Sequence, residues 1–220
     1  MITQKNGKKI NIHPAYKDSS GETLPSVTMI LNILAKPALI HWAWDLGTKG
    51  IDYRKSRDDK ADIGTLAHDF IMCHLKGVEC DTSLYTKEQI DIAETCFLKY
   101  LDWEKWHEIK PVLLETPLVS EKYHYGGTPD NYCMLDGVYT LVDYKTGKSI
   151  YEEYFYQLGG YNNLLIENNQ FPERFIVLRI GRDETEGFEV KELTDLKRET
   201  EIFIKLAEVY HLIKNKNGGK

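Results

Sequence analysis

Hydrophobic positions along the chain recur with two different spacings. Apolar residues that repeat every three or four positions predict helices, whereas short runs of β-branched and aromatic residues predict strands. The predicted helices cover residues 26–34, 38–46, 62–73, 86–109, 152–166 and the segment from 194 onward. The predicted strands cover residues 112–115, 117–120, 132–135, 138–142, 175–180 and 187–190. This order predicts a single α/β domain with a mixed central β-sheet flanked by helices and an N-terminal helical extension.

No linker, internal repeat or low-complexity segment divides the chain, and its 220 residues suffice for one domain with a full core. Ser26 is a favourable N-cap for the first helix. Pro111 is expected to stop the helix predicted over 86–109. Within a single domain over 1–220 we expect a hairpin over 1–25, a helical part over 26–109, an α/β core over 110–213 and a tail over 214–220.

The strongest local signal is a β-hairpin around the Asp136-Gly137 pair. Strands 132–135 and 138–142 flank this pair, and Asp-Gly is a strong turn signal because glycine accepts a positive φ without strain. The turn brings the outer ends of the two strands together. Charged residues lie at those ends, so the candidate functional residues of the hairpin are expected to lie close together there.

Three of these charged residues form a candidate catalytic group. Asp130 precedes the first strand, and Asp143 and Lys145 end the second. Since side chains alternate along a strand, Asp143 and Lys145 lie on one face and Tyr144 on the other. Two neighbouring carboxylates suit a hard divalent cation such as Mg²⁺, and an adjacent ammonium group can orient a water molecule. This composition is typical of sites that hydrolyse phosphodiester bonds.

An Asp/Glu-x-Lys triplet alone has little specificity. The same triplet occurs at Asp58/Lys60, Glu108/Lys110, Glu189/Lys191 and Asp195/Lys197, where solvated surface charge is the simplest interpretation. For Asp143 and Lys145 the corresponding interpretation is a surface ion pair at the end of a hairpin. They differ from the other triplets because they end an apolar strand and follow a Pro129-Asp130 pair.

A second candidate group lies in the helix predicted over 62–73. Gly64 and His68 are four residues apart and therefore lie on one face of the helix. Gly64 leaves room where another backbone comes close, so that the His68 side chain reaches past it. A lone helical histidine is more often structural than a metal ligand, and this pattern alone leaves both roles open.

Two further regions leave alternatives open. Trp42 and Trp44 have aromatic faces that stack on any base, although core packing is the favoured interpretation for Trp42. The segment 49–62 is dense in charges of both signs, which fits either a surface helix or a mobile loop.

These motifs together resemble a known superfamily. Pro129-Asp130 followed by Asp143-x-Lys145 resembles the PD-(D/E)xK nucleases, which implies the restriction-endonuclease-like core of that fold. The Gly64-x-x-x-His68 pattern upstream resembles the RecB-like exonuclease branch. That branch includes small phage-type exonucleases and those of the mitochondrial genome maintenance type, and the resemblance extends over about residues 24–180.

The resemblance also implies roles for individual residues. Asp130, Asp143, Lys145 and His68 would be catalytic, with His68, Asp130, Asp143 and the backbone carbonyl of Tyr144 binding one or two Mg²⁺ or Mn²⁺ ions. Lys145 would hold the attacking water. The supporting or substrate-binding positions implied are Glu115, Gln157, Tyr161 and Gly64.

Among the supporting positions, Gln157 and Tyr161 form a Gln-x-x-x-Tyr pattern after Asp-x-Lys that is similar to the RecB-like branch. Gln157 is expected to lie by the active site and contact DNA. For Tyr161, a functional role and core packing with the hydroxyl directed at the site are equally favoured.

Composition narrows the class of protein. A formal net charge of −6 argues against nucleic acid wrapping over the whole surface, but it leaves room for a local basic groove. No run is apolar enough to span a bilayer and no signal core follows Met1, so we expect a cytoplasmic protein without membrane contact, encoded by a phage in one interpretation. Some RecB-like nucleases hold an iron–sulfur cluster on four cysteines. Cys73, Cys80, Cys96 and Cys133 do not match that spacing, so we expect no cluster.

The expected function is a metal-dependent deoxyribonuclease, an exonuclease acting on single-stranded or double-stranded DNA ends in phage or mobile-element DNA processing, repair or recombination. One alternative is a module with this fold that binds nucleic acid or a partner without cutting. Another is a restriction-type or structure-specific endonuclease. The sequence leaves open polarity, strand preference, DNA versus RNA, the number of metal ions and the oligomeric state.

Overall fold

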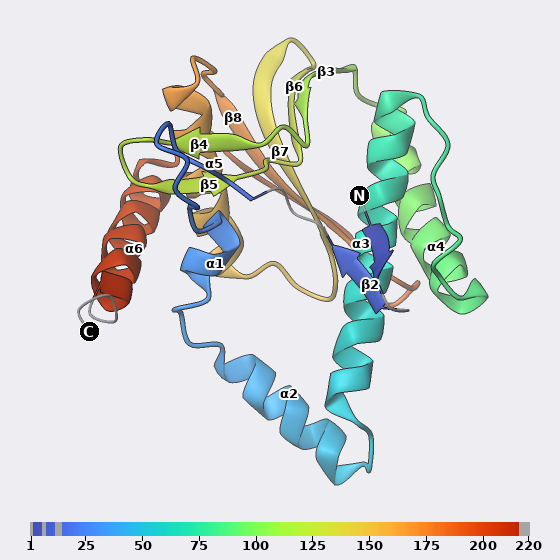
Figure 1. Ribbon diagram of the computed structural model, residues 1–220. Coiled ribbons are helices and arrows are strands. Elements are labelled where there is room, and N and C mark those ends of the chain that lie inside the picture. The colour runs from blue at the N-terminus through green and yellow to red at the C-terminus, as the bar shows by residue number, and fades with distance from the viewer. Residues whose placement is uncertain (1, 6–7, 12–14, 216–220) are drawn as a thin grey trace.

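A five-stranded mixed sheet forms the centre of the molecule (Figure 1). The computed structural model describes residues 2–5, 8–11 and 15–215. The strands run in the order β3 (Ile109–Leu114), β6 (Asn131–Leu135), β7 (Val138–Thr146), β8 (Arg174–Ile180) and β9 (Phe188–Leu193). Neighbours are antiparallel except β7 and β8, which are parallel. The predicted α/β fold with a mixed sheet is therefore confirmed.

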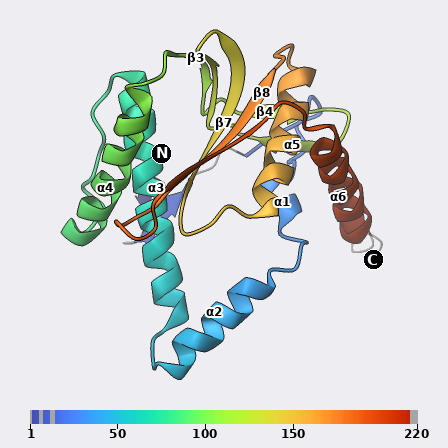
Figure 2. The same cartoon turned by 180° about the vertical axis from the view of Figure 1, so that it is seen from behind.

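Helices cover both faces of this sheet (Figures 1 and 2). The helices on one face are α3 (Tyr53–Lys76) and α4 (Lys87–Glu104), and those on the other are α1 (Val27–Leu31), α5 (Glu152–Glu167) and α6 (Lys197–Asn215). Leu141 and Val142 are neighbours on β7 but belong to different core clusters, because side chains alternate across a sheet. The same alternation directs Asp143 and Lys145 away from Tyr144.

The predicted hairpin joins β6 to β7. Asp136 and Gly137 both have positive φ angles, 51° and 82°, as a two-residue hairpin turn with the right-handed twist requires. Asn131 pairs with Val142 at the other end of the hairpin. Continued by one residue, this register sets Asp130 opposite Asp143, so the turn at one end positions two carboxylates at the other.

Two small sheets lie outside the central one. β1 (Ile2–Lys5) and β2 (Lys8–Asn11) form an antiparallel hairpin within the predicted N-terminal segment. β4 (Leu118–Ser120) pairs with β5 (Tyr125–Gly127), a strand that the sequence pattern misses because two of its three residues are glycine. Most of the predicted tail, residues 216–220, lies outside the described residues.

The helix predicted over 86–109 ends earlier than expected. Its last residue is Glu104, and Ile109 already pairs with Leu135 as the first residue of strand β3. Pro111 lies within β3, where the register shifts. Proline is tolerated there because β3 is an edge strand, so the prediction that Pro111 stops the helix is wrong. Long-range pairing with β6, invisible in the local pattern, decided the boundary.

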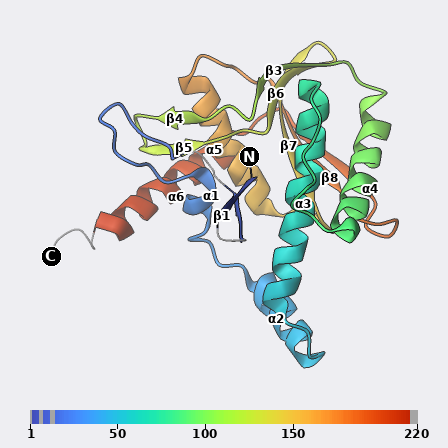
Figure 3. The same ribbon diagram turned by 45° about the vertical axis from the view of Figure 1, so that its right-hand side comes forward.

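Helix α2 (Pro37–Thr48) stands away from the sheet before the chain turns back into α3 (Figure 3). None of its residues is buried. Trp42 is half-buried and Trp44 is exposed. The core packing predicted for Trp42 is wrong, since no residue of this helix is buried by the described part of the chain.

The charged segment 49–62 is largely helical. α3 begins at Tyr53, behind Asp52, whose carboxylate accepts a hydrogen bond of 2.9 Å from the Arg54 backbone N–H. Of the two alternatives for this segment, the surface helix is therefore correct. No helix within the described part of the chain is both long and apolar enough to cross a membrane.

Candidate active site

A cavity of about 860 Å³ opens where α3, α5 and the open end of the β6–β7 hairpin meet. We call it the active-site cavity. Its lining includes eight of the nine predicted site residues: Gly64, His68, Glu115, Asp130, Tyr144, Lys145, Gln157 and Tyr161. The ninth, Asp143, is fully buried and contacts Lys145. Residues separated by almost one hundred positions thus converge as the motif spacing predicts.

The two hairpin carboxylates are held differently. The Tyr144 backbone N–H donates a hydrogen bond of 2.9 Å to Oδ2 of Asp130. Oδ2 of Asp143 lies 2.5 Å from Nζ of Lys145. Burial raises the pKa of Asp143 to about 6, and the nearby charge of Asp130 adds to this effect against the opposing attraction of Lys145. Burial also acts on Asp130, but His68 and Lys145 outweigh it and lower the pKa of Asp130.

His68 lies between two carboxylates. Its Nε2 is 3.2 Å from Oδ1 of Asp130, and its Nδ1 is 3.7 Å from Oε1 of Glu115. Burial lowers the pKa of His68, but Asp130 and Glu115 outweigh this effect and raise it. The ring also meets that of Tyr144 edge-on, with 6.2 Å between centroids.

Polar atoms in this group are incompletely satisfied. Among the described residues, Oδ1 of Asp143 is buried without a hydrogen bond. Nε2 of His68 and Oδ2 of Asp143 are buried too, and their close contacts are the ion pairs with Asp130 and Lys145. Buried polar atoms are almost always paired, so Oδ1 of Asp143 requires an explanation. Carboxylate oxygens with one imidazole are suitable ligands for Mg²⁺ or Mn²⁺, and a cation would satisfy them. The residues present therefore fit a divalent metal ion.

A third carboxylate, which the sequence analysis missed, stands beside this group. Ligand atoms of His68, Asp69 and Glu115 lie within 4.8 Å of one another. Burial raises the pKa of Asp69, and the charge of Glu115 raises it further. The available signal was its position next to His68, but adjacent helical residues point in different directions, so the sequence did not place Asp69 with His68.

Glu115 is held from two sides. Its backbone N–H donates to the carbonyl oxygen of Asp130 at 3.0 Å, and its Oε2 lies 2.5 Å from Nζ of Lys76. The predicted supporting role of Glu115 agrees with this placement but stays a prediction, as does metal binding by the Tyr144 carbonyl.

Gly64 sets the distance between α3 and β7. A Cβ atom at this position would come within 2.8 Å of Oγ1 of Thr146. The close neighbour is a side chain, whereas the sequence analysis expected another backbone. The consequence is as expected, because the helix approaches the strand closely enough for His68 to reach Asp130.

Helix α5 contributes the predicted Gln-Tyr pair. Nε2 of Gln157 donates a hydrogen bond of 2.9 Å to the Tyr161 hydroxyl. Tyr161 packs in the core cluster on the α5 face and also lines the active-site cavity, which agrees with core packing and leaves its functional role a prediction. Burial raises the pKa of Tyr161, and the charges of Asp130 and Asp143 act in the same direction.

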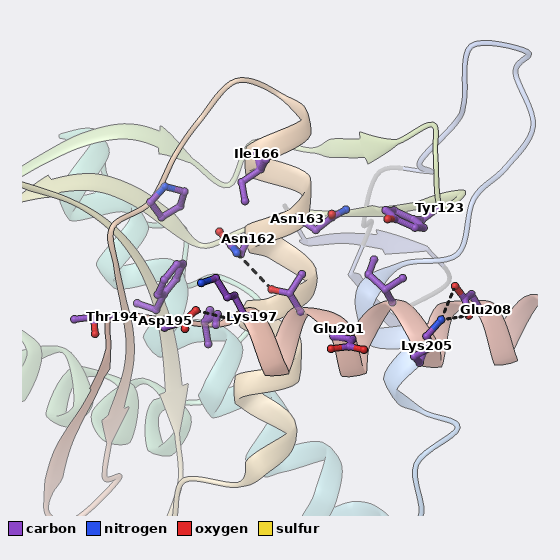
Figure 4. Close-up of a pocket in the computed structure, with 15 residues that line it drawn as sticks. Tyr123, Asn162, Asn163, Ile166, Thr194, Asp195, Lys197, Glu201, Lys205 and Glu208 are labelled. Atoms are coloured by element: carbon purple, nitrogen blue, oxygen red, sulfur yellow. Dashed lines mark hydrogen bonds and ion pairs between the residues drawn. The ribbon is translucent and has the colours of Figure 1, made fainter.

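Another cavity, of about 640 Å³, lies between α5 and α6 (Figure 4). Figure 4 shows Asn162 of α5 directed at α6, where it bonds Thr200 at 3.4 Å, and the Lys205–Glu208 pair along α6. None of the predicted site residues lines this cavity. The predicted site residues of α5, Gln157 and Tyr161, line the active-site cavity instead.

Comparisons with known proteins give a fold likeness only. No family model matches the chain, and no curated protein matches it. Among solved structures, a candidate exonuclease from Eubacterium rectale aligns with 72% of this chain and 69% of its own, with a TM-score of 0.48 and 13% identity. The alkaline exonuclease LHK-Exo from Laribacter hongkongensis aligns with 69% of this chain and 83% of its own, with a TM-score of 0.35 and 12% identity. Likeness at this level does not carry function, so the assignment rests on the site itself.

Proposed function

We propose that the protein is a metal-dependent nuclease that hydrolyses phosphodiester bonds in DNA, of the PD-(D/E)xK type, and that it acts as an exonuclease. The observation that carries this proposal is the convergence of His68, Asp130 and Lys145 on one cavity, with the buried carboxylate of Asp143 held against Lys145 and its Oδ1 left without a hydrogen bond from the described part of the chain. The motif resemblance supports a place in phage or mobile-element DNA processing, repair or recombination, in the cytoplasm.

His68, Asp130 and Asp143 would hold Mg²⁺ or Mn²⁺. The bound ion would supply a Lewis acid for the phosphoryl oxygens and a lower pKa for water. The Tyr144 N–H orients Asp130 so that its other oxygen faces His68. These contacts fix the donor atoms before substrate binds, which is the preorganisation that catalysis requires.

Lys145 has a separate role in this mechanism. Burial lowers the pKa of Lys145, but Asp143 and Asp130 outweigh burial and raise it, so its ammonium group stays charged at neutral pH. Held by Asp143, that group would orient the attacking water and offset charge that builds on the scissile phosphate.

The test is a cleavage time course with Mg²⁺ or Mn²⁺ on end-labelled linear single-stranded and double-stranded DNA, end-labelled RNA and closed circular DNA. We expect stepwise shortening of linear DNA only. Asp143→Ala or Lys145→Ala should lower the rate by about 10²-fold or more. The matched control is Glu108→Ala, since Glu108 and Lys110 form the same triplet as an exposed pair.

Each outcome has a distinct meaning. Full activity in either active-site variant would overturn the mechanism. Cleavage of closed circles would indicate the endonuclease alternative, and cleavage of RNA alone would exclude the DNA assignment. Saturable DNA binding without cleavage of any substrate would indicate the non-cleaving binding module.

A further inference from the structure

A second cavity, of about 730 Å³, adjoins the active-site cavity. Its walls come from the start of α2, the first turns of α3, the turn after β7 and the start of α5, and we call it the α2–α3 cavity. Thr146 lines both cavities. Nζ of Lys145 lies 5.3 Å from the ring centroid of Tyr154, another wall residue. A ligand in the α2–α3 cavity would therefore extend directly to the candidate catalytic lysine.

The charges of this cavity are mainly positive and come from distant parts of the chain. Lys36 is paired with Glu153 at 3.2 Å, Arg57 with Asp58 at 2.7 Å, and Arg182 with Glu186 at 3.0 Å. Within the part of the chain that the structure describes, no carboxylate forms an ion pair with Lys60 or Lys148, although both line the cavity. The remaining carboxylate is Glu152, whose Oε2 lies 3.4 Å from the Tyr156 hydroxyl.

Lys60 and Lys148 are close enough to disfavour one another. Burial lowers the pKa of Lys60, and the charges of Arg182 and Lys148 lower it further, against the weaker opposing charge of Glu186, which is itself paired with Arg182. An anion beside Lys60 and Lys148 would reduce the repulsion between these cations. Since Lys60 and Lys148 come from α3 and from the turn after β7, an anion between them would bridge the two walls of the cavity.

Aromatic rings stand beside these cations. Nζ of Lys60 lies 4.7 Å from the ring centroid of Trp42, and Tyr151 and Tyr154 meet edge-on with 5.6 Å between centroids. Trp42 belongs to a helix without buried residues, so core packing does not explain it. Aromatic faces beside cations are the combination with which proteins hold single-stranded nucleic acid, because bases stack on the rings and phosphates meet the cations.

We propose that the α2–α3 cavity binds a single strand of DNA next to the scissile phosphate, with Lys60 and Lys148 on backbone phosphates and Trp42 stacked on a base. The proposal rests on the proposed nuclease function and deepens it by naming a single-stranded segment as the substrate. The volume of the α2–α3 cavity agrees with a single-stranded segment, because about 730 Å³ is within the range of small-ligand pockets and too small to enclose a duplex. In Figure 1, α2 and the first half of α3 form a V below the β7–α5 connection, where such a strand would lie.

The test measures binding without cleavage. Fluorescence anisotropy with labelled dT12 and with a blunt 12-bp duplex, in buffer with EDTA, separates binding from metal-dependent chemistry. We expect dT12 to bind the unmodified protein more tightly than the duplex. The double variant Lys60→Gln/Lys148→Gln should weaken dT12 binding about tenfold, and its plot of log affinity against log salt should become shallower by roughly 1.4, or about 0.7 per lost phosphate contact.

Two further variants complete the design. Trp42→Ala should weaken dT12 binding by about tenfold, whereas Trp42→Phe, which keeps an aromatic face, should restore most of it. The matched control is Lys87→Gln/Lys105→Gln, which removes two exposed lysines on and just after α4, outside the cavity. This control should leave dT12 affinity and salt dependence unchanged.

The outcomes separate this inference from the proposed function. Unchanged dT12 affinity in the Lys60/Lys148 variant would overturn the single-strand DNA site, even if the protein cleaves DNA. The same holds if the unmodified protein binds the duplex, or a single-stranded RNA of twelve nucleotides, more tightly than dT12. Loss of dT12 binding in that variant, with no cleavage by the unmodified protein under any metal, would support the site and remove the nuclease function.

Discussion

At the scale of single residues, the notable feature is Asp143, a fully buried carboxylate whose one close partner among the described side chains is Lys145. Burial raises the pKa of Asp143 to about 6, so near pH 8, where this carboxyl group is ionised, its buried charge lowers the stability of the metal-free protein. A residue that lowers the stability of the folded protein and lies beside other potential metal ligands is characteristic of functional sites, because activity there is often gained at the expense of stability.

This leads to a prediction about metal binding that needs no substrate. We expect Mn²⁺ to raise the Tm of the unmodified protein by several degrees, because an ion that binds only the folded state at 100 times its Kd adds about 2.7 kcal/mol. Asp143→Asn should lose most of this gain. Thermal unfolding with and without Mn²⁺ measures the gain in both proteins. An equal gain in Asp143→Asn and in the exposed control Glu108→Ala would remove Asp143 from the metal site.

A second residue-scale prediction concerns the ion pair between Glu186 and Arg182. Burial raises the pKa of Glu186, but the Arg182 hydrogen bonds outweigh burial and lower it. A lowered carboxyl pKa contributes stability above the unfolded-state value of about 4.3, and that stability is lost as pH falls through the folded-state value. Glu186→Gln should therefore lower the free energy of unfolding by about 1–3 kcal/mol at pH 7 and by less near pH 3.

Urea unfolding at both pH values checks this expectation. The control is Glu208→Gln, which breaks the exposed Lys205–Glu208 pair and should cost under about 1 kcal/mol. A loss in Glu186→Gln that is the same at pH 3 and pH 7 would contradict the electrostatic explanation.

At the scale of elements, the approach of α3 to β7 decides whether His68 reaches the hairpin. The Cβ of Gly64→Ala would lie 2.8 Å from Oγ1 of Thr146, so the helix, the strand or the Thr146 side chain must shift. We expect this variant to fold but to lose about 10- to 100-fold in cleavage rate, since small displacements of catalytic groups are costly. Gly47→Ala is the control, because no atom lies within 4 Å of its added Cβ.

A double-variant cycle identifies the cause. Thr146→Ala removes the hydroxyl that the new methyl group would meet, so Gly64→Ala/Thr146→Ala should recover activity relative to Gly64→Ala. Additive losses in the double variant would show that the helix spacing is not set by this contact.

At the scale of the whole molecule, stability is unevenly distributed. The core clusters lie between the sheet and the two helical layers, whereas α2 contributes no buried residue. Local opening requires little energy where few apolar contacts are lost. We expect α2 amides to exchange hydrogen much faster than those of α4, and addition of dT12 to slow exchange in α2 but not in α4. Hydrogen exchange followed by mass spectrometry measures this, and equal protection of α2 and α4 in the free protein would contradict it.

The sequence by itself determined the elements whose causes are local. The Asp136-Gly137 turn, the alternation that separates Asp143 from Tyr144, and the four-residue spacing of Gln157 and Tyr161 all follow from backbone geometry over a few residues. The structure confirms each of them. The resemblance of the motifs then grouped distant residues, and the structure places them on one cavity.

Tertiary structure alone decided what depends on long-range partners. Ile109 lies in a strand and not in the predicted helix because it pairs with β6, and Trp42 lies outside the core because α2 has no buried residue. The fold brings Glu115 to Asp69 and His68, and the packing of α3 against β7 brings Lys60 near Lys148. Burial and the distances between charges depend on how the whole chain folds, so the local sequence pattern does not predict them.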